Sequence, residues 1–281
     1  MPEIRILDDR LVSQIAAGEV VERPASVVKE LLENSLDAGA TEVRVELEGG
    51  GKRRVRVADD GRGMDRDDAL LAFDRHATSK IAGFEDLERV ASLGFRGEAL
   101  SSIAAVARVE LITARQPGDG TRVRIEGGRV RSAGPVSHPR GTSVEVASLF
   151  YNVPARRKFL KTPRTELRRA AEMVQGYALA RPEIGFSLRH EGRVMLEAPP
   201  GGEGPEAARE RIRQVFGAEL ERHLVELPPG SMVDPEIVWG FVGDPSTGGS
   251  QRRFVFVNRR LLRDRAVLAT FYRAVREEWH G

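Results

Sequence analysis

The stretch that decides the fold reads Lys29-Glu30-Leu31-Leu32-Glu33-Asn34-Ser35-Leu36-Asp37-Ala38-Gly39. At about 100° per residue it predicts an amphipathic helix whose core-facing side carries Val28, Leu31, Leu32, Ser35 and Leu36. The polar side carries Glu30, Glu33, Asn34 and Asp37. Glu30 and Asn34 stand one turn apart, so a carboxylate that could hold a water lies beside a carboxamide that could hold a hard cation. Gly39 follows where a helix-ending glycine is expected.

An ordinary solvated helix face can show the same spacing, so this motif alone does not establish a site. The neighbouring sequence decides between the two interpretations. Pro24-Ala25-Ser26 predicts the start of the helix, with Ser26 as its N-cap. Residues 1–23 are mixed in character and are expected to form an N-terminal arm before the first compact unit.

Composition places the chain among soluble globular proteins with room for two domains, since it has 281 residues of which 41% are hydrophobic. No apolar run approaches the ~20 residues of a membrane span and the start lacks a signal peptide, so a cytoplasmic protein is expected. The absence of cysteine excludes disulfides and thiolate metal sites. The five histidines lack the spacing of a zinc site. Of 44 basic residues only five are lysines, a bias that genomic base composition explains as well as phosphate recognition does.

A hairpin follows the helix, because residues 42–48 and 53–58 alternate in polarity around three glycines. The second strand leads into Asp59-Asp60-Gly61-Arg62-Gly63-Met64. A carboxylate at a strand end can accept a hydrogen bond from an amino group, and alternate glycines let a flat ring approach the backbone. Plain turns use the same residues, so this motif is also weak alone.

A short helix is predicted at residues 67–73, before Arg75-His76-Ala77-Thr78-Ser79-Lys80 opens a long polar segment. That segment ends at Leu93-Gly94-Phe95-Arg96-Gly97-Glu98-Ala99-Leu100, where a helix begins whose apolar side carries Leu100, Ile103, Ala104 and Ala107. Glycines before a helix N-terminus expose backbone N–H groups at the positive end of its dipole, which predicts a phosphate seat. The chain has no Walker A sequence.

Strands are predicted at residues 108–113, 121–125, 129–131 and 142–146, with the Thr142 hydroxyl at a strand start. This order of helix, hairpin, loop, helix and strands indicates an α+β fold. A helix is predicted at residues 163–180 with an interruption at Gly176. The basic face of this helix is expected to carry seven residues that suit either an anion or plain solvation: Arg156, Arg157, Lys158, Lys161, Arg164, Arg168 and Arg169.

The Pro- and Gly-rich residues 199–205 predict a linker, which puts the first domain at 24–200 and a smaller second domain at 206–281. In the second domain a helix is expected at 207–216 and strands at 224–227, 236–242 and 253–257. A last helix is expected from Asp264.

Taken together, these motifs occur in the order of the Bergerat-fold (GHKL) ATPases, and the chain resembles the MutL family of DNA mismatch-repair proteins. The resemblance covers nearly the whole chain. It rests on Gln14-Ile15-Ala16-Ala17-Gly18-Glu19-Val20-Val21-Glu22-Arg23-Pro24, on the Arg75 and Gly94 motifs quoted above, and on Phe150-Tyr151-Asn152-Val153-Pro154-Ala155-Arg156-Arg157-Lys158-Phe159-Leu160.

The resemblance implies a Bergerat-type sandwich, with helices over a mixed, largely antiparallel sheet, followed by a domain like that of ribosomal protein S5. It implies that Glu30 is the general base for ATP hydrolysis and that Asn34 binds Mg²⁺. It also implies that Asp59 accepts from the adenine amino group, with Thr142 supporting that contact and Gly63 beneath the ring. The implied nucleotide-binding set is Asn34, Ala38, Asp59, Gly61, Gly63, Met64, Thr78, Ser79, Lys80, Gly94, Phe95, Arg96, Gly97, Glu98, Ala99, Leu100 and Thr142.

The implied partners are a nucleotide-dependent second copy, a mismatch-recognition protein of the MutS type, downstream repair enzymes and DNA of any sequence. The residues expected to contact DNA are Arg156, Arg157, Lys158, Arg259, Arg260 and Arg263, with Arg252 and Arg253 beside them.

Two departures from the family pattern matter. The family's D-N-G-x-G is Asp59-Asp60-Gly61-Arg62-Gly63 here, and the downstream Val-Asn-Val-His-Pro-Ala-Lys stretch, whose lysine is expected at the γ-phosphate, is absent. The chain is therefore expected to be truncated, its second domain included. Two hypotheses stay open: an ATPase that dimerises with nucleotide, and a nucleotide-binding coupling module with little hydrolysis of its own.

Overall fold

The computed structural model describes residues 8, 16–18, 20–74, 77, 98–227, 239–243, 253–262 and 269. The chain divides into two compact units. The first contains Met1–Gln175 and Glu183–Gly201, and the second contains Gly176–Pro182 and Gly202–Gly281. The division after Gly201 falls inside the Pro- and Gly-rich stretch, while the short piece Gly176–Pro182 groups with the second unit although the sequence placed it in the first.

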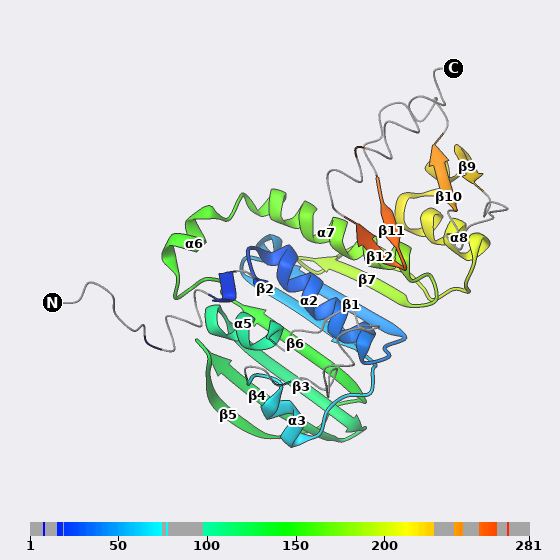
Figure 1. The fold of residues 1–281 in the computed structure, drawn as a ribbon. Helices are drawn as coiled ribbons and strands as arrows, with labels where there is room; N and C mark the ends of the chain where they lie inside the picture. Colours follow the sequence, from blue (N-terminus) through cyan, green and yellow to red (C-terminus); the bar gives the residue numbers. More distant parts are fainter. Residues whose placement is uncertain are drawn as a thin grey trace, which may run out of the picture. The chain divides into compact units, whose positions relative to one another are not determined.

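One eight-stranded sheet forms the body of the first unit, in the order β5-β4-β3-β6-β2-β1-β7-β8 (Figure 1). Its strands are β1 Glu42–Glu48, β2 Arg54–Asp59, β3 Arg108–Gln116, β4 Asp119–Glu126, β5 Arg129–Val136, β6 Gly141–Ala147, β7 Gly185–His190 and β8 Arg193–Ala198. Neighbouring strands are antiparallel except for β1 and β7, which pair in parallel. The expected mixed, largely antiparallel sheet of an α+β fold is confirmed.

The sequence prediction missed the β7–β8 hairpin, although Phe186 and Leu188 alternate with polar residues and Glu191-Gly192 supplies a turn with positive φ at both positions. Two short strands between a long helix and a Pro-rich stretch gave too few residues for the alternation to stand out.

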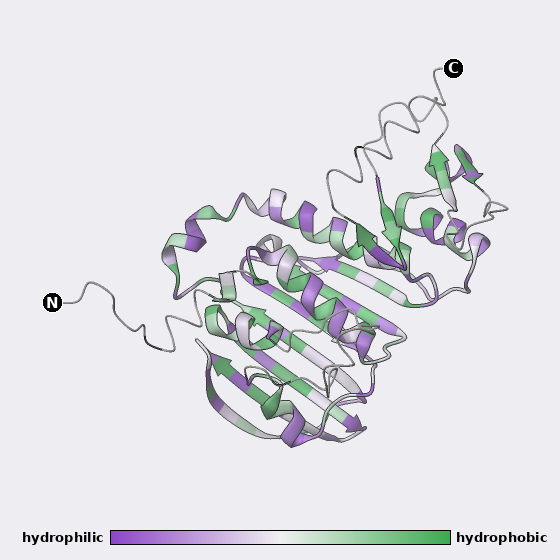
Figure 2. Ribbon diagram, in the orientation of Figure 1, coloured by the Kyte–Doolittle hydropathy of each residue, from purple (hydrophilic) through white to green (hydrophobic). Residues whose placement is uncertain are grey.

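Helices cover one face of this sheet, with α2 against β1 and β2, and α5 against β3 and β4 (Figure 1). The described part of the first unit includes the helices α2 Pro24–Asp37, α3 Arg66–Leu71, α5 Ala99–Val106, α6 Pro154–Phe159 and the greater part of α7 Pro163–Ala180. Figure 2 shows the hydrophilic and hydrophobic residues alternating along the strands. The buried set includes Val43, Val45, Leu47, Val55, Val57, Val109, Leu111, Val144 and Val146 from the strands and Val28, Leu31, Leu32 and Leu36 from α2.

The two ends of α2 form differently from each other. At the start Arg23, not Ser26, is the N-cap residue, and the prediction for Ser26 was wrong. Pro24 opens the helix because its fixed φ suits the first turn and its missing N–H is not needed there, which leaves Ser26 inside the helix with its backbone N–H bonded to the Arg23 carbonyl. At the other end Gly39 adopts φ +72°, and the predicted helix-ending glycine is confirmed.

Other helix predictions need correction. Glu33 was placed on the polar side of α2, yet it is only 7% exposed. The helix α7 runs through Gly176 without a break. A Cβ on Gly176 would come within 2.7 Å of the end of the Leu261 side chain, which would have to shift to make room. The basic run that was read as one helix face is divided, because α6 ends at Phe159 before α7 begins at Pro163.

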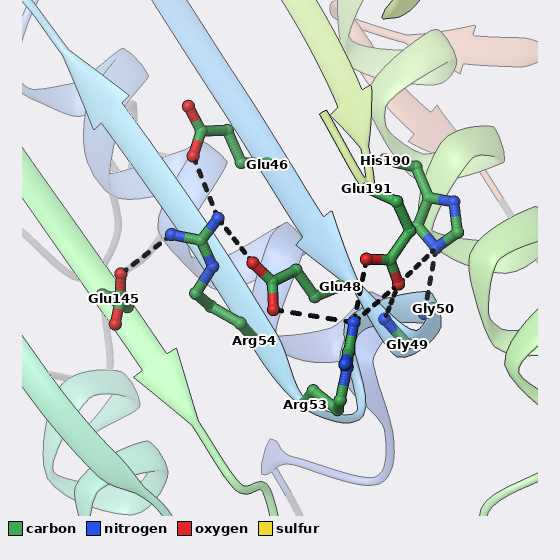
Figure 3. Close-up of polar contacts among 9 residues, drawn as sticks. All are labelled: Glu46, Glu48, Gly49, Gly50, Arg53, Arg54, Glu145, His190 and Glu191. Atoms are coloured by element: carbon green, nitrogen blue, oxygen red, sulfur yellow. Dashed lines mark hydrogen bonds and ion pairs between the residues drawn. The ribbon is translucent and has the colours of Figure 1, made fainter. Parts of the chain in front are cut away.

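The other face of the sheet carries paired charges near the β1–β2 turn (Figure 3). Arg54 lies 3.0 Å from Glu48 and 3.2 Å from Glu145 across the strands. At the turn itself, Glu191 Oε1 accepts from the Gly49 N–H at 2.9 Å, and both Glu191 carboxylate oxygens accept from Arg53 Nη2, at 2.9 and 2.8 Å (Figure 3). These contacts attach the β7–β8 hairpin to the central strands at the end of β1.

The second unit is described in pieces: α8 Pro205–Phe216, α9 Ala218–Arg222, and the strand pairs β9 Leu224–Leu227 with β10 Gly240–Gly243 and β11 Val255–Val257 with β12 Arg260–Leu262. Arg211 is 1% exposed and donates to the carbonyls of Ala178 and Pro182, which fastens α8 to the end of α7. The helix expected from Asp264 lies almost wholly outside the described residues. The likeness to ribosomal protein S5 stays a prediction.

Within the described part of the chain, no helix combines the length and apolarity needed to cross a membrane.

Candidate functional site

A row of three polar residues crosses the middle of the sheet where β2 ends. Asp59 on β2 pairs in register with Thr142 on β6, and Thr142 pairs in turn with Thr113 on β3. Because side chains directly opposite in antiparallel strands lie on the same face, the register alone brings a carboxylate and two hydroxyls together. The C-terminal half of α2 packs over this end of the sheet through Ser35, whose Oγ donates to Asp59 Oδ2 at 2.8 Å.

The Asp59 carboxylate is held by donors on several sides. Besides Ser35, the Gly61 N–H donates to Asp59 Oδ1 at 3.0 Å. Burial raises the pKa of the Asp59 carboxyl above its usual value, and this outweighs the opposite effect of the bonds from Ser35, Gly61 and the Thr142 backbone, while the Asp60 charge adds to the rise. A carboxylate that has lost water is a strong acceptor for a further N–H donor, such as the amino group of a base.

The hydroxyl of Thr113 is the centre of a second network. Thr113 is completely buried. Its Oγ1 donates to the Gly141 carbonyl at 3.1 Å, accepts from the Met64 N–H at 2.9 Å and lies 2.9 Å from Thr142 Oγ1. The Met64 N–H is therefore already bonded within the protein.

Two glycines let the 59–64 loop and the start of β6 pack as they do. Gly63 has φ +64°, and a Cβ there would lie 2.0 Å from the Ala114 carbonyl oxygen. Gly141 has φ +121°, and a Cβ there would lie 2.0 Å from the Asp59 carbonyl oxygen. Glycine is thus required at both positions by the protein's own backbone. The loop is also tied to the end of α2, because the Arg62 N–H donates to the Ala38 carbonyl at 3.0 Å.

Asp60, the residue that departs from the family pattern, has a structural role. Its Oδ1 accepts from the backbone N–H groups of Thr41 at 2.8 Å and Glu42 at 2.9 Å, and its Oδ2 accepts from the Thr41 hydroxyl. Slight burial raises the pKa of the Asp60 carboxyl, but these hydrogen bonds outweigh it and hold the pKa below the ordinary value. Asp60 therefore fixes the start of β1 beside the loop.

Glu30 lies on α2 beside the ammonium group of Lys29. Lys29 Nζ is 2.9 Å from Glu30 Oε1 and 3.0 Å from Glu33 Oε2. Burial lowers the pKa of the Lys29 ammonium, but the two carboxylates outweigh that effect and hold its pKa above the ordinary value. The Glu30 side chain is 19% exposed, which leaves it accessible to a water molecule. Asn34 follows one turn later and is half-buried.

The predicted phosphate site is described at its C-terminal end, Glu98 to Leu100. Thr78, Ser79, Lys80, Gly94, Phe95, Arg96 and Gly97 lie outside the described residues. Glu98 is the N-cap residue of α5, and Ala99 and Leu100 form the first turn of that helix, all three half-buried.

Sequence reasoning missed two residues of the site, Ser35 and Thr113. Ser35 was assigned to the core side of α2, where it is indeed buried, but its hydroxyl serves Asp59. Thr113 was read only as the end of a strand. The signal that could have found both is a hydroxyl residue on an otherwise apolar, core-facing stripe, because a buried hydroxyl needs a partner.

The residues expected to meet DNA differ in exposure. Arg156 is half-buried, with its guanidinium 5.3 Å from the centre of the Phe150 ring. Arg157 and Lys158 are exposed, and Phe159 beside them is 80% exposed. Arg259, which lies 3.5 Å from Glu203, is exposed, as are Arg253 and Arg260 in the second unit. Arg252 and Arg263 lie outside the described residues.

Among the residues that the structure describes, no group of three or more His, Cys, Asp or Glu side chains could hold a metal ion.

The chain matches known proteins over nearly its full length. A family model described as histidine kinase-, DNA gyrase B- and HSP90-like ATPase matches residues 22–133. A DNA mismatch repair protein MutL from Anaeromyxobacter dehalogenans is 52% identical over 98% of this chain. A second MutL, from Thiobacillus denitrificans, is 47% identical over 99% of it. The chain spans 45% and 46% of the lengths of these two relatives.

Solved structures agree with this pattern. The MutL ATPase domain of Aquifex aeolicus complexed with ADP superposes with a TM-score of 0.68 at 35% identity, covering 91% of this chain and 89% of the other. The N-terminal domain of a DNA repair protein gives a TM-score of 0.77 at 28% identity, covering 92% of this chain and 80% of the other.

Proposed function

The chain belongs to the MutL family, and from that premise we propose that it binds ATP beside Asp59 and hydrolyses it, serving as a nucleotide-driven switch in DNA mismatch repair. The observation that carries the proposal is the Asp59 carboxylate, which is desolvated and held by Ser35, Gly61 and Thr142 at the end of β2. Such an acceptor suits the amino group of adenine. The ADP complex of the Aquifex aeolicus domain supports a nucleotide at this fold.

Glu30 is the proposed general base. It lies on α2, on the helix that also supplies Ser35 to the adenine end, and its side chain is partly exposed. A carboxylate in this position can orient a water and take its proton as the water attacks the γ-phosphate. Lys29 keeps Glu30 in place through their 2.9 Å contact.

Asn34 is the proposed protein ligand for Mg²⁺, which would neutralise phosphate charge. The donor set fits this ion, since a single carboxamide oxygen leaves the remaining positions to phosphates and waters, as Mg²⁺ commonly binds. Residues 78–80 and 94–100 are proposed to cover the phosphates.

Assembly and partners remain proposals, because the chain spans under half of its relatives. ATP is proposed to favour a dimer in which residues 1–23 contact the second copy, and a mismatch-recognition protein of the MutS type and downstream repair enzymes would read that state. DNA is proposed to bind without sequence preference through exposed basic residues. These include Arg157, Lys158, Arg259 and Arg260.

Glu30→Gln tests the assignment of the base. A positioned general base contributes about 10²- to 10⁴-fold, so single-turnover phosphate release should fall by that factor while ATP affinity changes little. Glu172→Gln on α7 is the matched control, because the Glu172 side chain is 42% exposed and lies 3.1 Å from Arg168 on the same helix. Equal phosphate release from the parent and the Glu30 variant would contradict the assignment, and Glu33 or Asp37 would be examined next.

A further inference from the structure

We propose that Thr113 determines the base specificity of the nucleotide site by fixing the Thr142 hydroxyl as a hydrogen-bond acceptor. With Asp59 beside it, Thr142 then presents oxygen acceptors alone to the base, a pattern that favours the 6-amino group of adenine over the 6-oxo group of guanine. The inference rests on the proposed function, since it assumes that the base lies against Asp59 and Thr142.

The first step is the position of Thr113. It lies on β3, directly opposite Thr142 on β6, and Thr142 lies opposite Asp59 on β2. Thr113 is 0% exposed, so its hydroxyl has no access to water and must satisfy its hydrogen bonds within the protein. Thr113 therefore does not touch the base itself but contacts Thr142, which would.

The second step is the direction of each hydrogen bond. A hydroxyl has one proton and two lone pairs. Thr113 Oγ1 has three polar neighbours: the Gly141 carbonyl at 3.1 Å, the Met64 N–H at 2.9 Å and Thr142 Oγ1 at 2.9 Å. A carbonyl can only accept and an N–H can only donate. All three contacts are hydrogen bonds at once only when Thr113 donates to Gly141 and accepts both from Met64 and from Thr142.

The third step follows for Thr142. Its single proton is directed at Thr113, so the lone pairs of its oxygen are all that it can offer to a ligand. The Asp59 carboxylate likewise only accepts when ionised. An adenine amino group brings two protons to this pair of oxygens. A guanine 6-oxo group would face them without a donor, and a buried acceptor without a donor is penalised.

Removing the Thr113 hydroxyl should relax this selection. In Thr113→Val the shape is nearly kept, but Thr142 has no acceptor behind it and its hydroxyl can turn to donate to a 6-oxo group. Both nucleotides lose the support that Thr113 gives to Met64, so the informative quantity is the ratio of the two dissociation constants. In the variant, the guanine 6-oxo group gains a hydrogen bond from Thr142 where it would otherwise be an unsatisfied acceptor. This gain should narrow the ratio of the ATP and GTP dissociation constants by roughly tenfold.

The experiment measures dissociation constants for ATP and GTP with the full chain by calorimetry or competition. The parent should prefer ATP, Thr113→Val should narrow the ATP-to-GTP ratio by about tenfold, and Thr113→Ser, which keeps the hydroxyl, should retain the parent ratio. Thr121→Val is the matched control, because Thr121 is a buried threonine that pairs with Thr113 from β4. A ratio that stays at the parent value in Thr113→Val would overturn the proposal, since a purely structural role lowers both affinities together.

A measurement on the parent chain keeps the proposal testable if Thr113→Val does not fold. Three triphosphates that differ at position 6 are compared: those of adenosine, of purine riboside and of inosine. An acceptor-only row predicts the tightest binding for the amino group and the weakest for the oxo group. Inosine triphosphate binding as tightly as purine riboside triphosphate would contradict the inference. If Asp59→Asn leaves ATP affinity unchanged, the proposed function itself is contradicted. If Asp59→Asn weakens ATP binding but Thr113→Val keeps the parent ATP-to-GTP ratio, only this inference is contradicted.

Discussion

The Ser35 hydroxyl donates to Asp59 Oδ2 at 2.8 Å and so joins the central helix to the end of the strand β2. The same Oγ lies 3.1 Å from the Leu31 carbonyl within the helix. The carboxylate is the stronger acceptor because it is charged and closer. One side chain therefore fixes the distance between the helix that carries Glu30 and the carboxylate proposed to bind adenine.

Ser35→Ala should weaken ATP binding by roughly three- to tenfold, about 1 kcal/mol, because Asp59 loses one donor and is less well positioned. Calorimetric titration with ATP measures the effect. Ser26→Ala, a serine of the same helix, is the control and should bind as the parent does. An unchanged affinity in Ser35→Ala would show that the backbone bonds of Gly61 and Thr142 suffice to hold Asp59.

Asp59→Asn should weaken ATP binding about ten- to a hundredfold or somewhat more, because a hydrogen bond to a charged group is worth roughly 1.5–3 kcal/mol and the amide can present a donor instead. Asp119→Asn, a change at the start of β4, serves as the control in the same titration. Equal ATP affinity in the Asp59 variant and the parent would refute the adenine assignment.

As the pH is lowered, ATP affinity should begin to fall at a higher pH than it would if Asp59 had the ordinary pKa of an aspartate. Burial raises the pKa of Asp59, and a protonated carboxyl loses acceptor capacity. The raised pKa also means that Asp59 opposes folding when ionised, and this cost is relieved as the pH falls through its folded-state pKa. Titrations with ATP over a pH series compare the parent with Asp59→Asn. The variant should lack this fall in ATP affinity at low pH, because asparagine does not titrate. Protonation of the phosphates affects both proteins equally and so cancels in the comparison. Parallel pH curves would argue against a role for the Asp59 charge.

Asp60→Ala should lower stability at neutral pH by about 1 kcal/mol, a value reduced for the exposure of Asp60. The pKa of Asp60 is depressed in the fold. Its contribution is therefore present above the unfolded-state pKa and is lost as the pH falls through the lower folded-state value. Thermal unfolding at a series of pH values should show the difference between variant and parent shrinking in acid. Asp119→Ala is the control, and a difference independent of pH would contradict the ionic origin of the effect.

The double variant Arg157→Glu, Lys158→Glu should bind DNA more weakly, with a less steep dependence on salt. Each lost phosphate contact lowers the logarithmic salt slope by about 0.9 for duplex DNA, so two contacts lower it by roughly 2. Electrophoretic or anisotropy titrations at several salt concentrations measure the slope. The double variant Arg189→Glu, Arg193→Glu, at two exposed arginines of the β7–β8 hairpin, has the same change in net charge and is the control. A slope equal to that of the parent in the Arg157 and Lys158 variant would mark these two residues as solvated charges.

The sequence alone predicted the parts whose signals are local. The periodicity of residues 28–36 determined α2, three glycines placed the turn between β1 and β2, and Asp59 was correctly read as the end of a strand. Local rules succeed here because helix periodicity and turn-forming glycines act within a few residues of each other. The resemblance of the motifs supplied the family, which the comparison with solved structures confirmed.

Only the tertiary structure decided what lies behind those motifs. The parallel pairing of β1 with β7 and the hydrogen bond from Ser35 to Asp59 join residues that are far apart in the sequence. The burial of Glu33 depends on what packs against that side of α2, which the helix periodicity does not show. Thr113 and Thr142 are 29 positions apart, and only the β3–β6 register makes them neighbours. A serine or threonine in a core stripe can fill space, cap a turn or hold a ligand-binding group. Which of these it does depends on the partner that folding brings to its hydroxyl.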